Sequence, residues 1–304
     1  YRYRLVKQLR ELAWDGEPAK LFRKMHLHKK GTPTMGGLLI WITVAAVTVI
    51  FNLSRSQTWL PVFVLVTSGT LGFIDDFLNI RGVVRGLSTR LKFFFQFLIA
   101  GLGAWWFYYK LEFSEIRVPA GSLLGLPQSL DIGWLYIPLF VLTVVFITNA
   151  VNITDGLDGL AGGTLALSYG AILGIALVQD QVGIAAFAGT IVGALLAFLW
   201  FNIFPARFFM GDTGAFALGA TLAVLAFLTN SVLVLPIIAL IFVAEALSSL
   251  LQWFGKKFFQ KKVFLIAPLH HHFEALGWPE TKVTMRFWVI GAVVASIGLV
   301  IALI

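Results

Sequence analysis

Residues 59–78 read WLPVFVLVTSGTLGFIDDFL, an almost entirely apolar run that ends beside two adjacent aspartates, Asp75 and Asp76. A helix needs about 20 such residues to cross the hydrocarbon core of a bilayer. Because that core offers the backbone no hydrogen-bond partners, a run that crosses it is expected to be helical. The stretch therefore predicts a transmembrane helix that carries its carboxylates to one membrane surface.

Comparable apolar runs recur along the chain and predict an all-α, polytopic transmembrane bundle of about nine spans. They lie near 35–53, 59–78, 91–109, 134–152, 160–178, 182–203, 214–229, 232–254 and 286–304. The 304 residues are 59% hydrophobic and only 12% charged, with a mean hydropathy of +0.87. Soluble domains are roughly 45–50% apolar and about 25% charged. We expect residues 1–304 to form a single integral domain in a lipid bilayer, with a basic cytosolic segment over 1–34.

The basic residues support one orientation of this bundle. If segment 1–34 is inside, 20 of the 23 lysines and arginines fall on the inner side, and only Arg55, Lys110 and Arg117 fall outside. This distribution follows the positive-inside rule. The net charge of +8 is therefore explained by topology and by anionic lipid or phosphate, and nucleic acid is not expected as a partner. The absence of cysteine excludes disulfides, zinc-thiolate sites and thiol nucleophiles.

Polar side chains gather at the cytosolic helix ends in this topology. They are Asp75 and Asp76, Asn149, Asn152, Asp155 and Asp158, Asn202 and Asp212, and His270, His271 and His272. An ionisable residue near membrane depth is costly and usually functional. Magnesium takes oxygen ligands and often uses one or two carboxylates together with substrate phosphates. Taken alone, each acid could cap a helix or face solvent; three acidic loops on one face favour a magnesium-dependent phosphate site.

Two glycine-bearing loops accompany these acids, NAVNITDGLDGL (149–160) and FMGDTG (209–214). Their glycines permit tight turns and close ligand approach, or they simply end helices at the interface. Basic residues in nearby loops could neutralise a diphosphate. These are Lys29, Lys30, Arg85 and Lys92.

The histidines and one glutamate need separate treatment. Three consecutive histidines lack the i, i+4 spacing of a helical zinc site. Hydrogen bonding of residues 270–272 to phosphate or sugar oxygens is therefore the favoured interpretation. Glu245 lies inside a predicted span, where it is either the buried partner of a basic residue or a polar group in helix packing.

Five segments carry a family resemblance. They are KKGTPTMGG (29–37), FIDD (73–76), NAVNITDGLDGLA (149–161), WFNIFPARFFMGDTG (200–214) and APLHHHFEALGWPE (267–280). Together they resemble the phospho-N-acetylmuramoyl-pentapeptide transferases, or MraY translocases, of the polyprenyl-phosphate N-acetylhexosamine-1-phosphate transferase superfamily. The aspartate motifs are similar across the superfamily, whereas GTPTMGG and HHHFE resemble the muramoyl-pentapeptide branch.

The resemblance implies a reaction. Such an enzyme uses Mg2+ to transfer phospho-MurNAc-pentapeptide from UDP-MurNAc-pentapeptide to undecaprenyl phosphate, giving lipid I and UMP for peptidoglycan biosynthesis. It works at the cytosolic side of the bacterial inner membrane. The oligomeric state is left open, a homodimer included.

The resemblance also implies residue roles. Asp212 matches the magnesium ligand, Asp75 and Asp76 match the catalytic pair, and Asp75 becomes the candidate base for the lipid phosphate. Further active-site positions are Asn149, Asn152, Asp155, Lys92, Lys29, Thr34, His270, His271 and His272. The uridine pocket would be formed by Gly156, Leu157, Asp158, Asn202, Phe209 and Gln252. Phe209 would stack on the uracil ring, as an accessible aromatic side chain can.

The chain departs from the family pattern in three places. The family has ten spans, and segment 1–34 stands where its first span would lie, so we expect this segment to be either truncated or atypical. Asn79 stands where a lysine usually follows the aspartate pair, which leaves that charge lost or supplied by Arg81 or Arg85. Ala215 replaces a common serine.

Two other functions stay open at the level of sequence. A sister transferase would use UDP-GlcNAc or another UDP-HexNAc with the same motifs. A transporter or channel would place its polar site near the bilayer middle and reachable from both sides. The observed motifs stand at inner helix ends, which favours the transferase.

Overall fold

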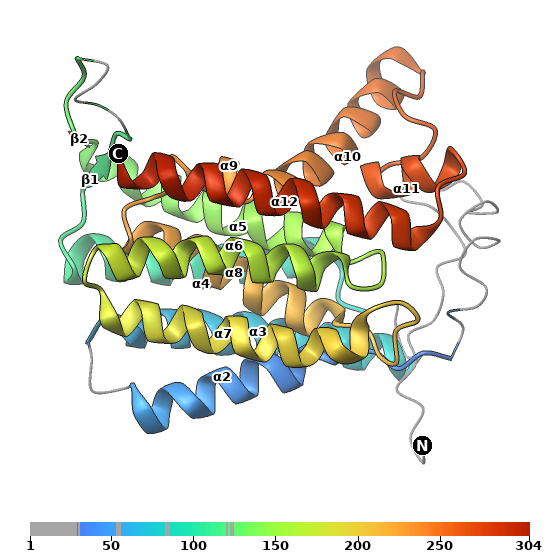
Figure 1. Cartoon of the computed structure of the whole chain (residues 1–304), viewed down its shortest axis with the longest axis horizontal. Coiled ribbons are helices and arrows are strands. Elements are labelled where there is room, and N and C mark those ends of the chain that lie inside the picture. The colour runs from blue at the N-terminus through green and yellow to red at the C-terminus, as the bar shows by residue number, and fades with distance from the viewer. Residues whose placement is uncertain (1–28, 30, 53–55, 83–85, 120, 122–124) are drawn as a thin grey trace.

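The computed structural model describes residues 29, 31–52, 56–82, 86–119, 121 and 125–304, and it is a bundle of long helices lying side by side (Figure 1). The principal helices are α2 (Gly37–Phe51), α3 (Trp59–Ile80), α4 (Thr89–Lys110), α5 (Tyr136–Thr154), α6 (Leu160–Val178), α7 (Val182–Asn202), α8 (Gly211–Leu228) and α12 (Glu280–Leu303). Among the described residues, seven of them are long and apolar enough to cross a membrane, and α2 is a shorter apolar helix of 15 residues. The predicted all-α polytopic fold is confirmed.

Helix α8 lies at the centre of the bundle, and all 18 of its residues are buried. It packs against α2, α3, α5 and α6 (Figure 1). Glycines let the backbones approach closely, as small residues do in membrane bundles. A Cβ added to Gly72 of α3 would lie 2.2 Å from the Asp212 carbonyl oxygen. This contact fixes the end of α3 that bears Asp75 and Asp76 against the start of α8.

One predicted span, 232–254, differs from the structure. The helix is interrupted at Ala239, which separates the short α9 (Leu235–Ile238) from α10 (Leu240–Phe259). Figure 1 shows α10 leaving the bundle at an angle. The outward course of α10 fits its amphipathic pattern, because polar residues recur at helical spacing along one face of this helix. These residues are Glu245, Ser248 and Gln252. Gln252 binds the segment before α11 (Leu269–Ala275), and Ser248 and Glu245 bind the first two residues of α11 itself.

Short elements complete the described part of the chain. Strands β1 (Glu115–Arg117) and β2 (Ser129–Asp131) pair antiparallel, with Glu115 opposite Asp131. This hairpin lies near one end of the bundle and α11 at the other (Figure 1). The turns η2 (Ser56–Thr58) and η3 (Gly133–Leu135) precede α3 and α5. The predictions for residues 1–28, Lys30, Arg55 and Arg85 fall outside the described residues.

Candidate active site

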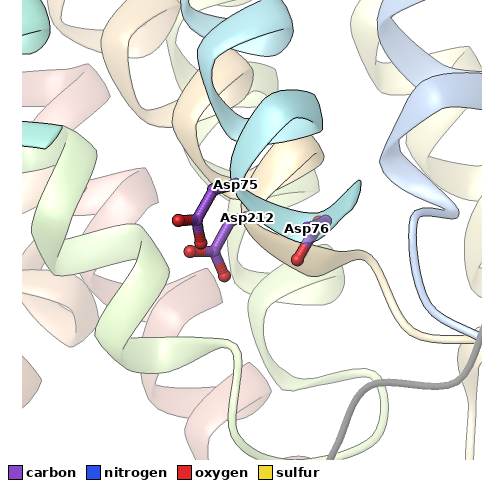
Figure 2. A group of neighbouring side chains, drawn as sticks. All are labelled: Asp75, Asp76 and Asp212. Atoms are coloured by element: carbon purple, nitrogen blue, oxygen red, sulfur yellow. The ribbon is translucent and has the colours of Figure 1, made fainter. Parts of the chain in front are cut away.

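A cluster of three buried aspartates forms where α3 meets α8. Asp75, Asp76 and Asp212 are 2%, 0% and 5% exposed, and each offers a carboxylate oxygen within 4.8 Å of the other two. Figure 2 shows Asp75 and Asp212 side by side, with Asp76 on the other side of the α3 backbone end. Neighbours on a helix differ by about 100° in direction, so the adjacent pair reaches two sides of one site. Asp212 lies in the first turn of α8, whereas the sequence placed it in the loop before that helix.

Each carboxylate of the cluster is held by a defined donor. Lys92 Nζ lies 2.7 Å from Asp75 Oδ2 and 3.1 Å from Asp212 Oδ2, and it joins these two acids. Leu87 N–H donates to Asp75 Oδ1 at 2.6 Å, and Thr213 N–H donates to Asp76 Oδ2 at 3.1 Å. Charge-assisted bonds of this kind orient carboxylates firmly. The result is a fixed set of hard oxygen ligands, which is the donor chemistry that Mg2+ requires.

The loop 155–159, between α5 and α6, lies beside this cluster. Gly211 N–H donates to Asp155 Oδ2 at 3.2 Å, which joins the loop to the start of α8. Ala206 N–H donates to Asp158 Oδ2 at 2.9 Å. Asn202 accepts from Gly159 N–H at 3.1 Å and donates to the Phe208 carbonyl at 2.9 Å. The loop can end in this conformation because Gly159 has a φ of 75°, a value that favours glycine.

A buried ion network connects this loop to the N-terminal motif and to α12. Lys29 Nζ lies 2.8 Å from Asp158 Oδ1 and 2.5 Å from Glu280 Oε1, and the same Glu280 oxygen accepts from Asp158 N–H at 2.6 Å. No role had been predicted for Glu280. It is the last residue of the segment 267–280 and follows Pro279 at the start of α12, where an acid is usually explained by the helix dipole alone.

We expect Glu280→Ala to lower the thermal unfolding temperature clearly. Removing one partner leaves Lys29 and the Asp158 N–H short of an acceptor, and loss of one member of a buried ion pair costs about 3–5 kcal/mol. Differential scanning fluorimetry of the purified protein measures the change. Glu115→Ala, on the exposed edge of β1, is the matched control, and equal unfolding temperatures for the two variants would contradict the structural role of Glu280.

The three histidines engage three different partners. His270 Nδ1 lies 3.0 Å from Glu245 Oε2, His271 Nδ1 lies 2.7 Å from Glu274 Oε2, and Leu265 N–H donates to His272 Nδ1 at 3.2 Å. Glu245 contacts the imidazole of His270, both residues are 0% exposed, and the same contact packs α10 against α11, so the structure fits both interpretations of Glu245. Among the described residues, the only group of three or more candidate metal ligands is the aspartate cluster, so the histidines do not gather as a zinc site.

Several other predicted residues lie around the same end of the bundle. Phe209 pairs through its backbone with Pro33 and Gly36, and its ring lies 5.7 Å from Lys29 Nζ. Thr34 is 5% exposed, and its hydroxyl is close to Gly211.

The remaining predicted positions have structural contacts of their own. Asn149 donates to Gln96 Oε1 at 2.8 Å, and Asn152 is half-buried on the last turn of α5. Leu157 is 4% exposed within an apolar cluster, and Gln252 binds the backbone of Val263 and Phe264 on α10's polar face. The structure therefore does not bring Gln252 and Leu157 into contact with the aspartates by any interaction it describes, and their substrate roles stay predictions.

The structure also shows where the residues that differ from the family pattern lie. Asn79 is on the last turn of α3, and the Arg81 guanidinium lies 4.4 Å from the Phe77 ring. Ala215 is fully buried in α8, one turn from Asp212. The Arg81 side chain stacks on Phe77. Within the described residues, the cation that contacts the aspartate cluster is Lys92.

Comparison with known proteins gives one consistent result. The family model described as glycosyl transferase family 4 matches residues 58–230, and the phospho-N-acetylmuramoyl-pentapeptide-transferase signature 1 matches residues 29–40. The chain is 43% identical to the phospho-N-acetylmuramoyl-pentapeptide-transferase of Chloroflexus aurantiacus, over 100% of this chain and 83% of that protein. It is 42% identical to the Geobacillus thermodenitrificans transferase of the same name, over 91% and 86% of the two chains. The corresponding Bacillus subtilis protein is 38% identical, over 98% and 92%. The matched regions contain the aspartate cluster, Lys92 and the 155–159 loop, and the chain belongs to the phospho-N-acetylmuramoyl-pentapeptide-transferase family.

Proposed function

We propose that this protein transfers phospho-MurNAc-pentapeptide from UDP-MurNAc-pentapeptide to undecaprenyl phosphate, releasing UMP and forming lipid I for peptidoglycan synthesis. Family membership supports the reaction. The observation in the structure that carries it is the buried cluster of Asp75, Asp76 and Asp212, bridged by Lys92 and adjacent to the 155–159 loop. Carboxylates, an ammonium group and glycine-bearing turns are the chemistry that a reaction between two phosphates needs.

We assign Mg2+ to the aspartate cluster, with Asp212 as its principal ligand. The three carboxylates supply the hard oxygen ligands that the ion prefers, with oxygens close enough to share it. When bound, the ion would neutralise charge on the diphosphate of the donor.

The described side chains account for the remaining steps. Lys92 and the Leu87 N–H hold Asp75 in one orientation, from which it accepts the proton of the polyprenyl phosphate. The freed phosphate oxygen attacks the sugar-side phosphorus of the donor. A new P–O bond forms, the bond to the UMP phosphate breaks, and UMP leaves with the electron pair. Positioning and charge neutralisation supply most of the acceleration in such transfers.

The site is proposed to face the cytosol of a bacterium, within the inner membrane. The lysines and arginines of the predicted loops support this orientation through the positive-inside rule. A water-soluble nucleotide donor is present on that side, and the acceptor lipid approaches from the bilayer.

Release of UMP tests the proposal. We expect the purified protein to release UMP when UDP-MurNAc-pentapeptide and undecaprenyl phosphate are both present with Mg2+. Chelation with EDTA should abolish release and added Mg2+ should restore it, because the carboxylates alone cannot neutralise the donor diphosphate. Equal release from UDP-GlcNAc would favour the sister transferase, and solute flux in liposomes without turnover would favour a transporter.

A further inference from the structure

We propose that Glu245 is a positioning residue that fixes the 155–159 loop by orienting His270. The inference rests on the proposed function in one respect, because it takes this loop as part of the site for the UDP-linked donor. It is carried by the contacts of α10 with α11 and by the contact of His270, in α11, with Gly156.

Glu245 makes two specific contacts with one residue. His270 N–H donates to Glu245 Oε1 at 3.1 Å, and His270 Nδ1 lies 3.0 Å from Glu245 Oε2. Both residues are 0% exposed. An ionised carboxylate is costly in such a setting unless it is hydrogen-bonded, so the two donors are what make Glu245 tolerable there.

This geometry fixes the state of the imidazole ring. When Glu245 is ionised, its carboxylate only accepts hydrogen bonds, and Nδ1 is then the nitrogen that carries the proton. The other nitrogen, Nε2, is then left to face the opposite direction. It is buried, and within the described part of the chain it has no hydrogen-bond partner.

Gly156 lies directly against that nitrogen. A Cβ added to Gly156 would lie 2.3 Å from His270 Nε2 and 3.0 Å from Cε1, both closer than van der Waals contact allows. The imidazole ring of His270 therefore packs directly against the 155–159 loop at Gly156. Asp155 directly precedes Gly156 and binds Gly211, and Asp158 lies two residues after Gly156 and binds Lys29. A tilt of the ring would move the loop and the groups it binds.

A second contact between the same helices provides a matched control. Leu269 N–H donates to Ser248 Oγ at 3.1 Å, one residue before His270, and Ser248 lies one turn after Glu245 on α10. Glu245 and Ser248 thus both hold the start of α11, but only Glu245 touches the imidazole ring. Loss of Ser248 tests docking of α11 without changing the ring.

The experiment compares Glu245→Gln with Ser248→Ala in the full chain, by UMP release at varied donor and varied acceptor. Glutamine has one acceptor oxygen for the two His270 donors, so it cannot accept from the backbone N–H and from a protonated Nδ1 at the same time. We expect the donor KM of Glu245→Gln to rise about tenfold, with kcat and acceptor KM changed less than about threefold. For Ser248→Ala we expect a lower unfolding temperature and a donor KM within about twofold of the unchanged protein. Equal donor KM values for the two variants would show that Glu245 only docks α11.

If Glu245→Gln does not fold, a second pair of variants still tests the proposal. Gly156→Ala places a methyl group against Nε2 and should raise the donor KM in the same way. The increase should shrink when His270→Ala is combined with it, because the methyl group then has room, and contacting residues couple in a double-mutant cycle. Additive effects would overturn the assignment. If the unchanged protein releases no UMP from UDP-MurNAc-pentapeptide, the proposed function fails; if it does and the variants behave as docking mutants, only the role of Glu245 fails.

Discussion

Asp212→Asn is expected to reduce Mg2+-dependent UMP release by about 10²–10³-fold or more. Asparagine keeps the size of the side chain but removes the charge that would hold the cation beside Asp75 and Asp76. Lys92 would keep its 2.7 Å contact with Asp75, so the fold should persist. The loss should therefore appear in turnover and in the Mg2+ concentration needed for half-maximal rate, while the unfolding temperature stays near that of the unchanged protein.

The matched control for this prediction is Asp180→Asn. Asp180 is exposed at the end of α6 with a φ of 55°, a conformation that asparagine adopts readily. This variant should retain full UMP release. Retention of release by Asp212→Asn within about tenfold of the unchanged protein would remove Asp212 from the catalytic site.

Gly72→Ala is expected to cause the second large loss, although residue 72 bears no reactive group. Its methyl group would lie 2.2 Å from the Asp212 carbonyl oxygen and 2.6 Å from the Thr213 Cα, both on the backbone of α8. The helices must move apart, which costs about 1–3 kcal/mol. A displacement of about 1 Å between reacting groups can lower turnover roughly 100-fold. UMP release and thermal unfolding should therefore fall together.

Gly101→Ala is the control for the glycine variant. Gly101 lies within α4, and a Cβ there would meet nothing within 4 Å. Its activity should match that of the unchanged protein, and its unfolding temperature should stay the same or rise, because alanine favours a helix more than glycine does. If Gly72→Ala were equally silent, the close approach of α3 and α8 would not determine the geometry of the aspartate cluster.

The sequence predicted that the aspartates gather at one end of the bundle. The placement of charged residues and the hydropathy pattern both indicate which helix ends share a membrane surface. Asp75 and Asp212 each stand at the end of an apolar run on the inner side in the predicted topology. Long apolar segments also fixed the positions of most helices. These features are periodic or compositional, and they do not depend on knowing which helix contacts which.

Other features depend on tertiary contacts and could not be predicted in this way. The interruption at Ala239 is a matter of backbone angles, and its flanking residues are as apolar as those of any span. Glu280 looked like an ordinary helix-start acid until its contact with Lys29, 251 residues earlier, was known. The pairing of Glu245 with His270 spans 25 residues and joins two helices. For Glu280 and Glu245, the informative partner was distant in sequence.

The complete burial of α8 has a consequence for how the enzyme responds to its membrane. Helices that touch lipid tilt or bend when bilayer thickness changes, so as to match their apolar length to the hydrocarbon core. Each of the 18 residues of α8 is covered by protein, and Asp212 stands in its first turn. Hydrophobic mismatch therefore acts on the outer helices and reaches this aspartate only through them. The central helix is held by protein on every side, so Asp212 has no direct contact with lipid, whereas Asp75, Asp76 and Lys92 stand on helices that are partly exposed.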